Sequence, residues 1–296
     1  MNSTQKILLV LILIITGTSG LIFYLHPELN ENFRNASWQT SMQKRIFGEF
    51  HDNFERTEIL KETALSSESD NASWWLSSGG EMVVEGSLAK TLQQNLSVDN
   101  YWYSRYKSNN PTDTDGGLHP QNIFRLVTKE KWKNYTQQIY FMVNKDNLSQ
   151  SSNRNSSNGI FLFNRYQDEN NLYYTGLRVD GRVIIKKKVN GYYYTMANKV
   201  VLKGLDYNYE SNPNLIPKNI WIGLKSETIN NLNKSVKIRL MMDLGRQNRW
   251  QTVLEVEDDG RSFGGPAIRK EGNAGIRTDF MDVQFDDYRI YRSNLF

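Results

Sequence analysis

The 296 residues of this chain are 39% hydrophobic and 23% charged, a composition typical of globular rather than disordered proteins. The net charge of +4 is small for this length, and no block of Lys and Arg resembles a nucleic-acid arm, so we expect no nucleic-acid partner. Cysteine is absent and histidine occurs three times, which excludes disulfides and argues against a zinc site.

An apolar segment without charged residues, 7–25, follows a single lysine, Lys6. At helical rise its length just covers the hydrocarbon core of a bilayer. The segment is either a signal peptide cleaved near the small residues 18–20, or a retained signal anchor with a short cytoplasmic N-terminus. Under both alternatives the rest of the chain is exported. We therefore expect an extracytoplasmic protein, membrane-anchored or secreted, whose membrane contact is residues 7–25.

A polar stretch without periodicity, residues 26–47, reads as a stalk between this signal anchor or signal peptide (residues 1–25) and a single domain (residues 48–296). Sequons of the form N-x-S/T are consistent with an exported glycoprotein. Beyond the apolar segment they occur at Asn35, Asn71, Asn95, Asn134, Asn147, Asn155 and Asn233.

From residue 48 onward the chain consists of short apolar or alternating runs divided by Asn, Gly and Asp, which predicts β-strands. Strands are expected at residues 82–86, 122–128, 137–144, 159–166, 171–179, 182–188, 191–197, 219–227, 235–243, 251–257 and 274–291. Asp180-Gly181 and Asn190-Gly191 are two-residue type I′ turn signals, so residues 171–197 should form a three-stranded meander. About eleven strands exceed an immunoglobulin domain and favour an all-β, two-sheet jelly-roll sandwich.

Three segments resemble the concanavalin A-like lectin/glucanase superfamily. They are WWLSSGGEMVVEGSL (74–88), GIFLFNRYQDENNLYYTGLRVDGRVIIKKKVNGYYYT (159–195) and GNAGIRTDFMDVQFDDYRIYR (272–292). The last is similar to the closing strand of that superfamily, which returns beside the first strand. The resemblance covers about residues 48–293. It extends to laminin-G-like domains, family 16 glycoside hydrolases, the 3-keto-disaccharide hydrolase domain and alginate-lyase-like sandwiches. It implies a concanavalin-like sandwich, and it leaves the activity open.

The catalytic motifs of these relatives are present only in part. Family 16 hydrolases carry three carboxylates on one strand, whereas here Glu255 and Glu257 are followed by an acid at a turn. Alginate-lyase-like proteins have a Q-I-H strand, and this chain has Tyr140 in place of the histidine. We therefore expect a carbohydrate-binding or adhesion module that recognises a cell-surface glycan. The alternative is a polysaccharide lyase or glycoside hydrolase on the same fold.

Residues two apart on a strand share a side, so the residues that alternate with the apolar ones face outward. If these outward sides line one concave sheet, they present aromatic rings for sugar faces and cations for hydroxyls and carboxylates. The structural alternative is a solvated sheet whose lysines protect edge strands. The candidate carbohydrate-binding residues are Arg165, Tyr166, Tyr174, Arg178, Lys186, Lys188, Tyr192, Trp221 and Arg239.

A structural calcium ion is a further candidate, because jelly rolls often clamp their first and last strands with an oxygen-ligated ion. Asp52 and Asp286 lie in the corresponding segments. The alternative is that both are ordinary turn or cap residues. No other cofactor is expected.

Overall fold

The computed structural model describes residues 49–204 and 206–293. The predicted membrane segment 7–25 and the predicted stalk 26–47 therefore lie outside the described residues, and the domain division stays a prediction. Within the described ranges, every helix is too short or too polar to cross a lipid bilayer.

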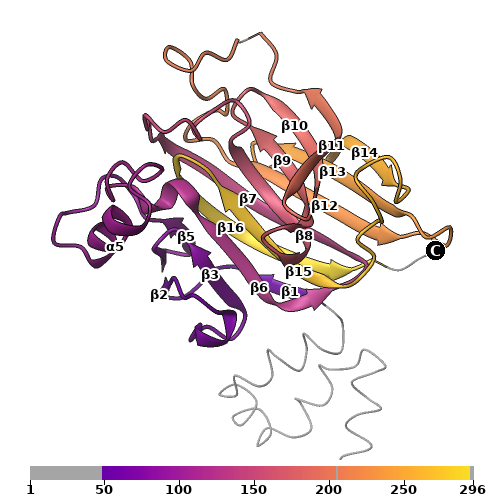
Figure 1. Cartoon of the computed structure of the whole chain (residues 1–296), viewed down its shortest axis with the longest axis horizontal. Coiled ribbons are helices and arrows are strands. Elements are labelled where there is room, and N and C mark those ends of the chain that lie inside the picture. The colour runs from indigo at the N-terminus through magenta and orange to yellow at the C-terminus, as the bar shows by residue number, and fades with distance from the viewer. Residues whose placement is uncertain (1–48, 205, 294–296) are drawn as a thin grey trace, which may run out of the picture. The chain divides into compact units, whose positions relative to one another are not determined.

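Two antiparallel sheets make up the described part of the chain (Figure 1). The nine-stranded sheet has the order β14 (Gln251–Asp258), β13 (Val236–Leu244), β12 (Ile222–Asn230), β7 (Tyr135–Asp146), β16 (Met281–Arg292), β5 (Leu88–Thr91), β4 (Glu81–Glu85) and β2 (Glu58–Lys61), with β1 (Glu49–Asp52) also paired to β16. The seven-stranded sheet has the order β11 (Tyr192–Val200), β10 (Arg182–Val189), β9 (Asn171–Arg178), β8 (Gly159–Asp168), β15 (Gly272–Thr278), β6 (Arg125–Trp132) and β3 (Trp74–Ser78). This all-β architecture of two antiparallel sheets, with β16 beside β1, agrees with the predicted sandwich.

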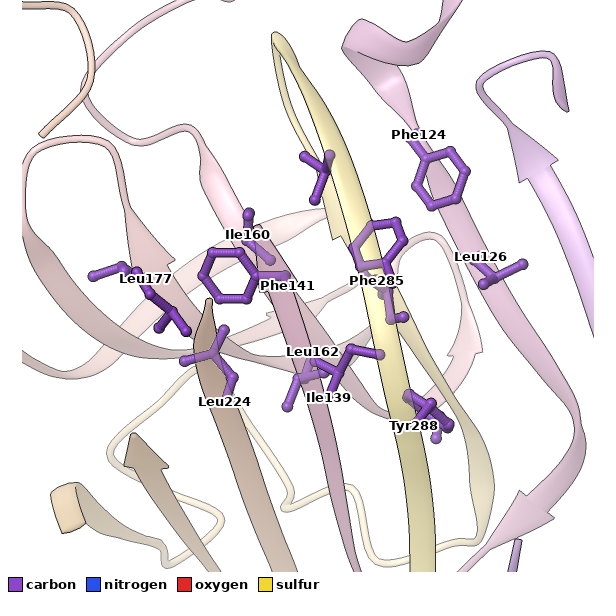
Figure 2. Close-up of a cluster of buried hydrophobic side chains, with 14 of the residues drawn as sticks. Phe124, Leu126, Ile139, Phe141, Ile160, Leu162, Leu177, Leu224, Phe285 and Tyr288 are labelled. Carbon is purple, nitrogen blue, oxygen red and sulfur yellow. The ribbon is translucent and has the colours of Figure 1, made fainter. Parts of the chain in front are cut away.

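The hydrophobic core lies between the sheets, because the strands alternate apolar and polar residues. Phe141 and Phe285 come from the nine-stranded sheet, and Ile160, Leu162 and Leu177 come from the seven-stranded sheet; all five are completely buried. Figure 2 shows these side chains meeting in one cluster. The inward and outward assignment predicted for residues 171–179 and 236–242 is correct, since Tyr173 and Ile238 lie in this core.

A buried ion pair crosses the sandwich beside this core. Lys187 of β10 places its Nζ 2.9 Å from Oδ2 of Asp258 on β14, and neither side chain is exposed to solvent. The hydroxyl of Tyr173 donates to the same carboxylate at 2.6 Å, and Nζ of Lys187 also donates to the carbonyl of Gly265 at 2.9 Å. Burial, followed by the charge of Asp258, raises the pKa of Tyr173 well above its usual value. Both buried charges thus have hydrogen-bond partners, as their desolvation requires.

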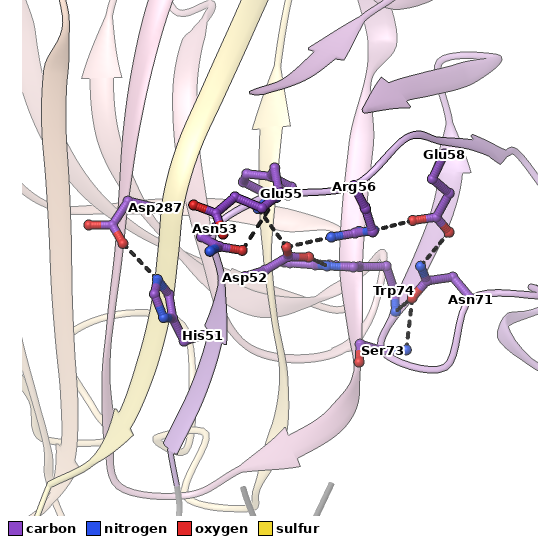
Figure 3. A network of polar contacts seen from close by, with 11 residues as sticks. His51, Asp52, Asn53, Glu55, Arg56, Glu58, Asn71, Ser73, Trp74 and Asp287 are labelled. Carbon is purple, nitrogen blue, oxygen red and sulfur yellow. Dashed lines mark hydrogen bonds and ion pairs between the residues drawn. The ribbon is translucent and has the colours of Figure 1, made fainter. Parts of the chain in front are cut away.

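A second polar network fixes the first strands of the described region (Figure 3). Asp52 of β1 accepts hydrogen bonds from Arg56 at 2.6 Å and from the indole of Trp74 at 2.7 Å. His51 contacts Asp287 of β16 at 2.8 Å. Because Trp74 belongs to the seven-stranded sheet and β16 to the nine-stranded sheet, this network joins the two sheets at one end.

Most predicted strands are present, with three differences. The meander 171–197 is confirmed. Its second turn has positive φ at both Asn190 and Gly191, as a type I′ turn requires, but its first turn has positive φ only at Gly181 and not at Asp180. The expected single strand 274–291 is two strands, β15 and β16, in different sheets. They are separated by a turn at Phe280, which also has positive φ. Four short strands before residue 92 were not predicted: β1, β2, β3 and β5.

The α-helix α5 (Tyr101–Asn109), seen beside β5 in Figure 1, was also not predicted from the sequence. Asn100 caps it by accepting a hydrogen bond from the backbone of Trp102. Trp102 and Tyr106 then pack on Leu92 in a small cluster. Two 3₁₀ turns, η1 (Ser66–Glu68) and η2 (Pro120–Ile123), complete the described elements.

Candidate functional site

A cavity of about 420 Å³ opens on the outer face of the seven-stranded sheet, the face turned away from the core. Six adjacent strands of this sheet, β6, β15, β8, β9, β10 and β11, each contribute one side chain to it. In strand order these residues are Arg125, Arg277, Phe161, Tyr174, Lys186 and Tyr193. We call this set the cavity row.

Strand register explains why these residues form a row. Arg277 of β15 is paired with Phe161 on one side and with Arg125 on the other. Lys186 of β10 is paired with Tyr174 of β9. Tyr174 is a diagonal neighbour of Phe161, whose direct partner is Gly176. Tyr193 is a diagonal neighbour of Lys186, because its direct partner is Lys188. Paired residues on adjacent strands, and residues two apart on one strand, point to the same face, so six separate segments bring their side chains together.

The walls of the cavity come from loops that the sequence marks as polar. Residues 108–120 supply Asp113, and residues 145–158 supply Asn153, Asn155, Ser157 and Asn158. Ser151 and Asn153 donate to Asp113 at 2.6 and 3.0 Å, which ties the second loop to the first. Amides and hydroxyls therefore surround an aromatic and cationic floor.

Arg277 and Asp279 form an ion pair in the cavity. Nε of Arg277 donates to Oδ1 of Asp279 at 2.8 Å. The guanidinium lies 5.7 Å from the ring centre of Phe161 and 5.8 Å from that of Tyr174. Burial opposes the charge of Arg277, but the carboxylate of Asp279 outweighs it and raises the arginine pKa.

Arg125 and Lys186 form no ion pair with any of the described residues. Nη1 of Arg125 donates to the carbonyl of Ile123 at 2.9 Å and to Oγ of Ser78 at 3.2 Å. Burial and then the charge of Arg277 lower the pKa of Arg125. Burial, followed by the charges of Arg178 and Arg277, lowers the pKa of Lys186. The two cations are thus held close to a third positive charge.

Two tyrosines form the aromatic side of the cavity. The rings of Tyr174 and Tyr193 are stacked with centres 5.8 Å apart, and the hydroxyl of Tyr174 donates to that of Tyr193 at 3.5 Å. Burial would raise the pKa of Tyr193, but this hydrogen bond and the charges of Arg277 and Lys188 lower it. Tyr193 is 52% exposed, so part of this residue is open to the solvent.

Two of the predicted residues line this cavity, and four others are on the same sheet without lining it. Tyr174 and Lys186 belong to the cavity row, and Lys188 lies 4.8 Å from the ring centre of Tyr193. Arg178 is on the same strand as Tyr174, where it donates to Asp180 at 2.8 Å. Others lie beside the cavity without lining it. Tyr166 stacks on Phe163 of the same outer face, and Tyr192, which is 71% exposed, precedes Tyr193.

Three other predicted residues do not join the site. Trp221 comes just before β12 and Arg239 is on β13, so both belong to the nine-stranded sheet. The expectation that all outward sides line one concave sheet is therefore wrong, because alternation gives the side of a strand and not its sheet. Arg165 is completely buried: it lies in a β-bulge with positive φ, where its guanidinium donates to the carbonyls of Lys133 and Ile268.

The sequence did not point to Arg125, Arg277, Phe161 or Tyr193. A signal existed for Arg125, Arg277 and Phe161, because each stands next to an inward-facing residue of its strand. Phe161, for example, lies between the core residues Ile160 and Leu162. The outward residues that come together are set by the order of the strands in the sheet. This order cannot be read from short segments of the sequence.

The two candidate calcium ligands have protein partners. Asp52 accepts from Arg56 and Trp74, and Oδ2 of Asp286 lies 2.6 Å from Nη2 of Arg246. In the described part of the chain, no three His, Cys, Asp or Glu side chains gather in a way that would hold a metal ion. A structural calcium ion stays a prediction without a test.

The predicted sequons differ in accessibility. Asn147 is 2% exposed, and its Nδ2 donates to Asp282 at 2.9 Å, so this position is closed to a glycan in the folded chain. Asn35 lies outside the described residues.

No family model and no curated protein matches this sequence. Solved structures that match include the carbohydrate-binding module CBM66 from Bacillus subtilis, with 14% identity over 58% of this chain and 83% of the module, at a TM-score of 0.38. A β-glucanase from Bacillus licheniformis matches with 9% identity over 83% of this chain and 98% of its own, at a TM-score of 0.42. The GH43 protein BlXynB from Bacillus licheniformis matches with 13% identity over 82% of this chain, which spans only 39% of that protein, at a TM-score of 0.42. Likenesses this distant do not bear on what the chain binds.

Proposed function

We propose that this chain is an exported glycan-binding module, which holds a sugar in the cavity on the outer face of the seven-stranded sheet. The observation that carries the proposal is the cavity row, in which stacked tyrosines lie next to cations without carboxylate partners. The predicted apolar segment 7–25, as an anchor or a cleaved signal, would place this surface outside the cytoplasm.

The physical features of the cavity match the needs of sugar binding. A volume of about 420 Å³ is within the range of ligand pockets in proteins. An exposed tyrosine ring offers an apolar face for the CH groups of a sugar ring. The surrounding amides of Asn153, Asn155 and Asn158 can donate to and accept from hydroxyls.

Glycoside hydrolysis is not favoured by the carboxylates of the cavity. One carboxyl group of a hydrolase must stay protonated, which requires a raised pKa. Burial acts in that direction at Asp113, but hydrogen bonds from Ser151, Asn153 and Asn110 outweigh it and lower the pKa. Oδ1 of the other acid, Asp279, is bound to Arg277. Glu255 and Glu257 are on β14, in the other sheet.

One observation favours a lyase as the second candidate function. A tyrosine with a lowered pKa, such as Tyr193, is better suited to act as a general base than an ordinary tyrosine. In such a reaction the phenolate takes the proton next to the carboxylate of an acidic sugar. The glycosidic C–O bond then breaks, a C=C bond forms, and the leaving oxygen takes up a proton. The cations of the cavity would stabilise the charge that develops on the carboxylate.

A glycan array with the full-length chain in detergent tests the proposal, using Tyr193→Ala and its neighbour Tyr192→Ala as a matched pair. Both tyrosines are exposed, but only Tyr193 lines the cavity. We expect Tyr193→Ala to weaken glycan binding about 10-fold and Tyr192→Ala to leave it unchanged. Equal effects of the two substitutions, or none, would contradict binding in the cavity.

The same samples distinguish the two candidate functions. Assays for new reducing ends and for unsaturated sugars should detect no product if the chain only binds. Unsaturated product that disappears in Tyr193→Phe would establish the lyase instead.

A further inference from the structure

The cavity is lined by three cations and two carboxylates, Asp113 and Asp279, which leaves an excess of one positive charge. Arg125, Lys186 and Arg277 face the cavity, and of these three cations only Arg277 has a carboxylate partner, Asp279. Arg277 is the strand partner of Arg125, and Lys186 lines the same cavity, so the three cations lie within electrostatic range of one another. The second acid of the cavity, Asp113, accepts hydrogen bonds from the neutral side chains of Ser151 and Asn153 and forms no ion pair within the described residues.

Such an arrangement is unfavourable in the free protein. Bringing cations together and partly removing them from water costs free energy unless an opposite charge compensates. An anion in the cavity would supply this compensation.

The donors of Arg125 are also suitably disposed for an anion. Its Nη1 is the only atom of the guanidinium that donates to a described protein group. The hydrogens of Nε and Nη2 are therefore available, and the planar fork of a guanidinium matches a carboxylate or sulfate group.

A polar group without a partner completes the site. Oδ2 of Asp279 is buried and receives no hydrogen bond in the described structure. A negative oxygen here would repel the anionic group itself, but it is a good acceptor for a hydroxyl. The cavity thus combines two unpaired cations with an acceptor, which is complementary to a molecule with both an anionic group and hydroxyls.

We infer that the cavity selects an acidic sugar, one that carries a carboxylate or a sulfate ester, over a neutral sugar of the same size. The anionic group contacts Arg125 and Lys186, a ring hydroxyl donates to Asp279, and the ring of Tyr193 lies against the sugar. This inference rests on the proposed glycan binding and specifies its ligand class.

Calorimetric titration of the full-length chain tests this with three probes of equal length: a galactose oligosaccharide, its galacturonate counterpart and its sulfate ester. We expect at least one acidic probe to bind about 10-fold tighter than the neutral one, as for hydrogen bonds to charged groups. Preference for the galacturonate would identify a carboxylate as the anion, and preference for the ester a sulfate.

A matched pair of lysine substitutions separates cavity binding from general attraction to a basic protein. Lys186→Met removes a half-buried strand lysine of the cavity. Lys225→Met removes a half-buried strand lysine that lies 4.1 Å from the ring centre of Trp250 in the other sheet. Lys186→Met should weaken binding of the acidic probe about 10-fold while leaving the neutral probe unaffected, and Lys225→Met should change neither.

Each contrary result has its own meaning. Equal or tighter binding of the neutral probe overturns the inference and leaves the proposed function standing. Equal losses in the two lysine variants also overturn it, because the attraction would then be a property of net charge. If the folded chain bound none of these probes, nor any glycan of the array, the proposed function itself would fail.

Discussion

The outer faces of the two sheets have similar residues, but they differ in how their cations are paired with carboxylates. On the nine-stranded sheet, Arg239 contacts both Glu227 and Glu255, at 3.3 and 2.7 Å, and Arg246 pairs with Asp286. On the seven-stranded sheet, Arg125 and Lys186 have no such partners among the described residues. Aromatic rings and cations occur together on both faces, so their presence alone does not mark a site. What distinguishes the cavity is that three cations, Arg125, Lys186 and Arg277, line one hollow of the surface.

The aromatic residues differ in the same way. Trp221, a residue that the sequence suggested for sugar binding, has the guanidinium of Arg246 5.3 Å from its ring centre. The ring of Trp250 is contacted by Lys225 and by Tyr140, whose ring centre is 5.4 Å away. The ring of Tyr193 also has a cation near it, Lys188, but Tyr193 is 52% exposed and lines a cavity. The feature that supports the proposed binding site is therefore the cavity, and not the presence of aromatic rings alone.

The largest effect should come from the buried ion pair below the cavity. Lys187, adjacent to Lys186, points inward to Asp258, so the two lysines contrast a compensated with an uncompensated charge. Asp258→Asn leaves Lys187 buried without a counter-charge, and we expect the free energy of unfolding to fall by about 3–5 kcal/mol. Lys186→Met should instead raise it slightly, by about 0.5 kcal/mol, because it removes a half-buried cation that has no carboxylate partner within the described residues. Chemical denaturation measures both, and similar values for the two would remove the contrast.

Two glycines on the outer faces should respond to alanine to different extents. A Cβ on Gly176 of β9 would overlap the carbonyl oxygen of Ile160, so the backbone of the seven-stranded sheet must shift. A Cβ on Gly223 of β12 would lie 2.6 Å from the end of the Trp250 ring, a side chain that can move. We expect losses of about 3 kcal/mol for Gly176→Ala and about 1 kcal/mol for Gly223→Ala. Thermal unfolding gives the order, and the reverse order would contradict the assigned register of β8 and β9.

The last effect is a pH dependence on the nine-stranded face. Burial, followed by the charge of Arg289, lowers the pKa of Lys225 from 10.5 to about 8. Below pH 8 both the folded and unfolded states carry this proton. Between pH 8 and 10.5 the unfolded state keeps the proton that the folded state releases, so the free energy of unfolding rises with pH in this interval.

The variant Lys225→Met isolates this contribution from the titration of the tyrosines. The difference in unfolding free energy between the unsubstituted chain and the variant should grow in favour of the unsubstituted chain from pH 8 to 10.5. A difference that stays constant would show that Lys225 is solvated.

Local patterns were sufficient for the meander and for the two faces of its strands. Tyr173 and Tyr174 were assigned to opposite sides because a strand alternates, and the structure confirms it. The short strands before residue 92 were missed because runs of four or five residues show too little alternation. Helix α5 was missed because its aromatic residues, such as Trp102 and Tyr106, favour strands in isolation.

The site could be predicted only in part, for a non-local reason. Tyr174 and Lys186 were found because β9 and β10 are consecutive in the sequence and in the sheet. Arg277 was missed because β15 joins the seven-stranded sheet between β6 and β8, far from either in the sequence. Arg165 was wrongly predicted to face outward because a bulge interrupts the alternation of β8. The residues next to Arg165 in the sequence do not indicate this bulge.

The position of β16 has a consequence for how the chain is made. This strand lies between β5 and β7, both of which a ribosome produces long before residues 281–292. Until then, these two strands each keep an edge whose backbone groups lack their native partner, which is a template for association with other chains. We expect nascent chains that stop short of β16 to depend on chaperones for solubility and to become independent of them once this strand is inserted.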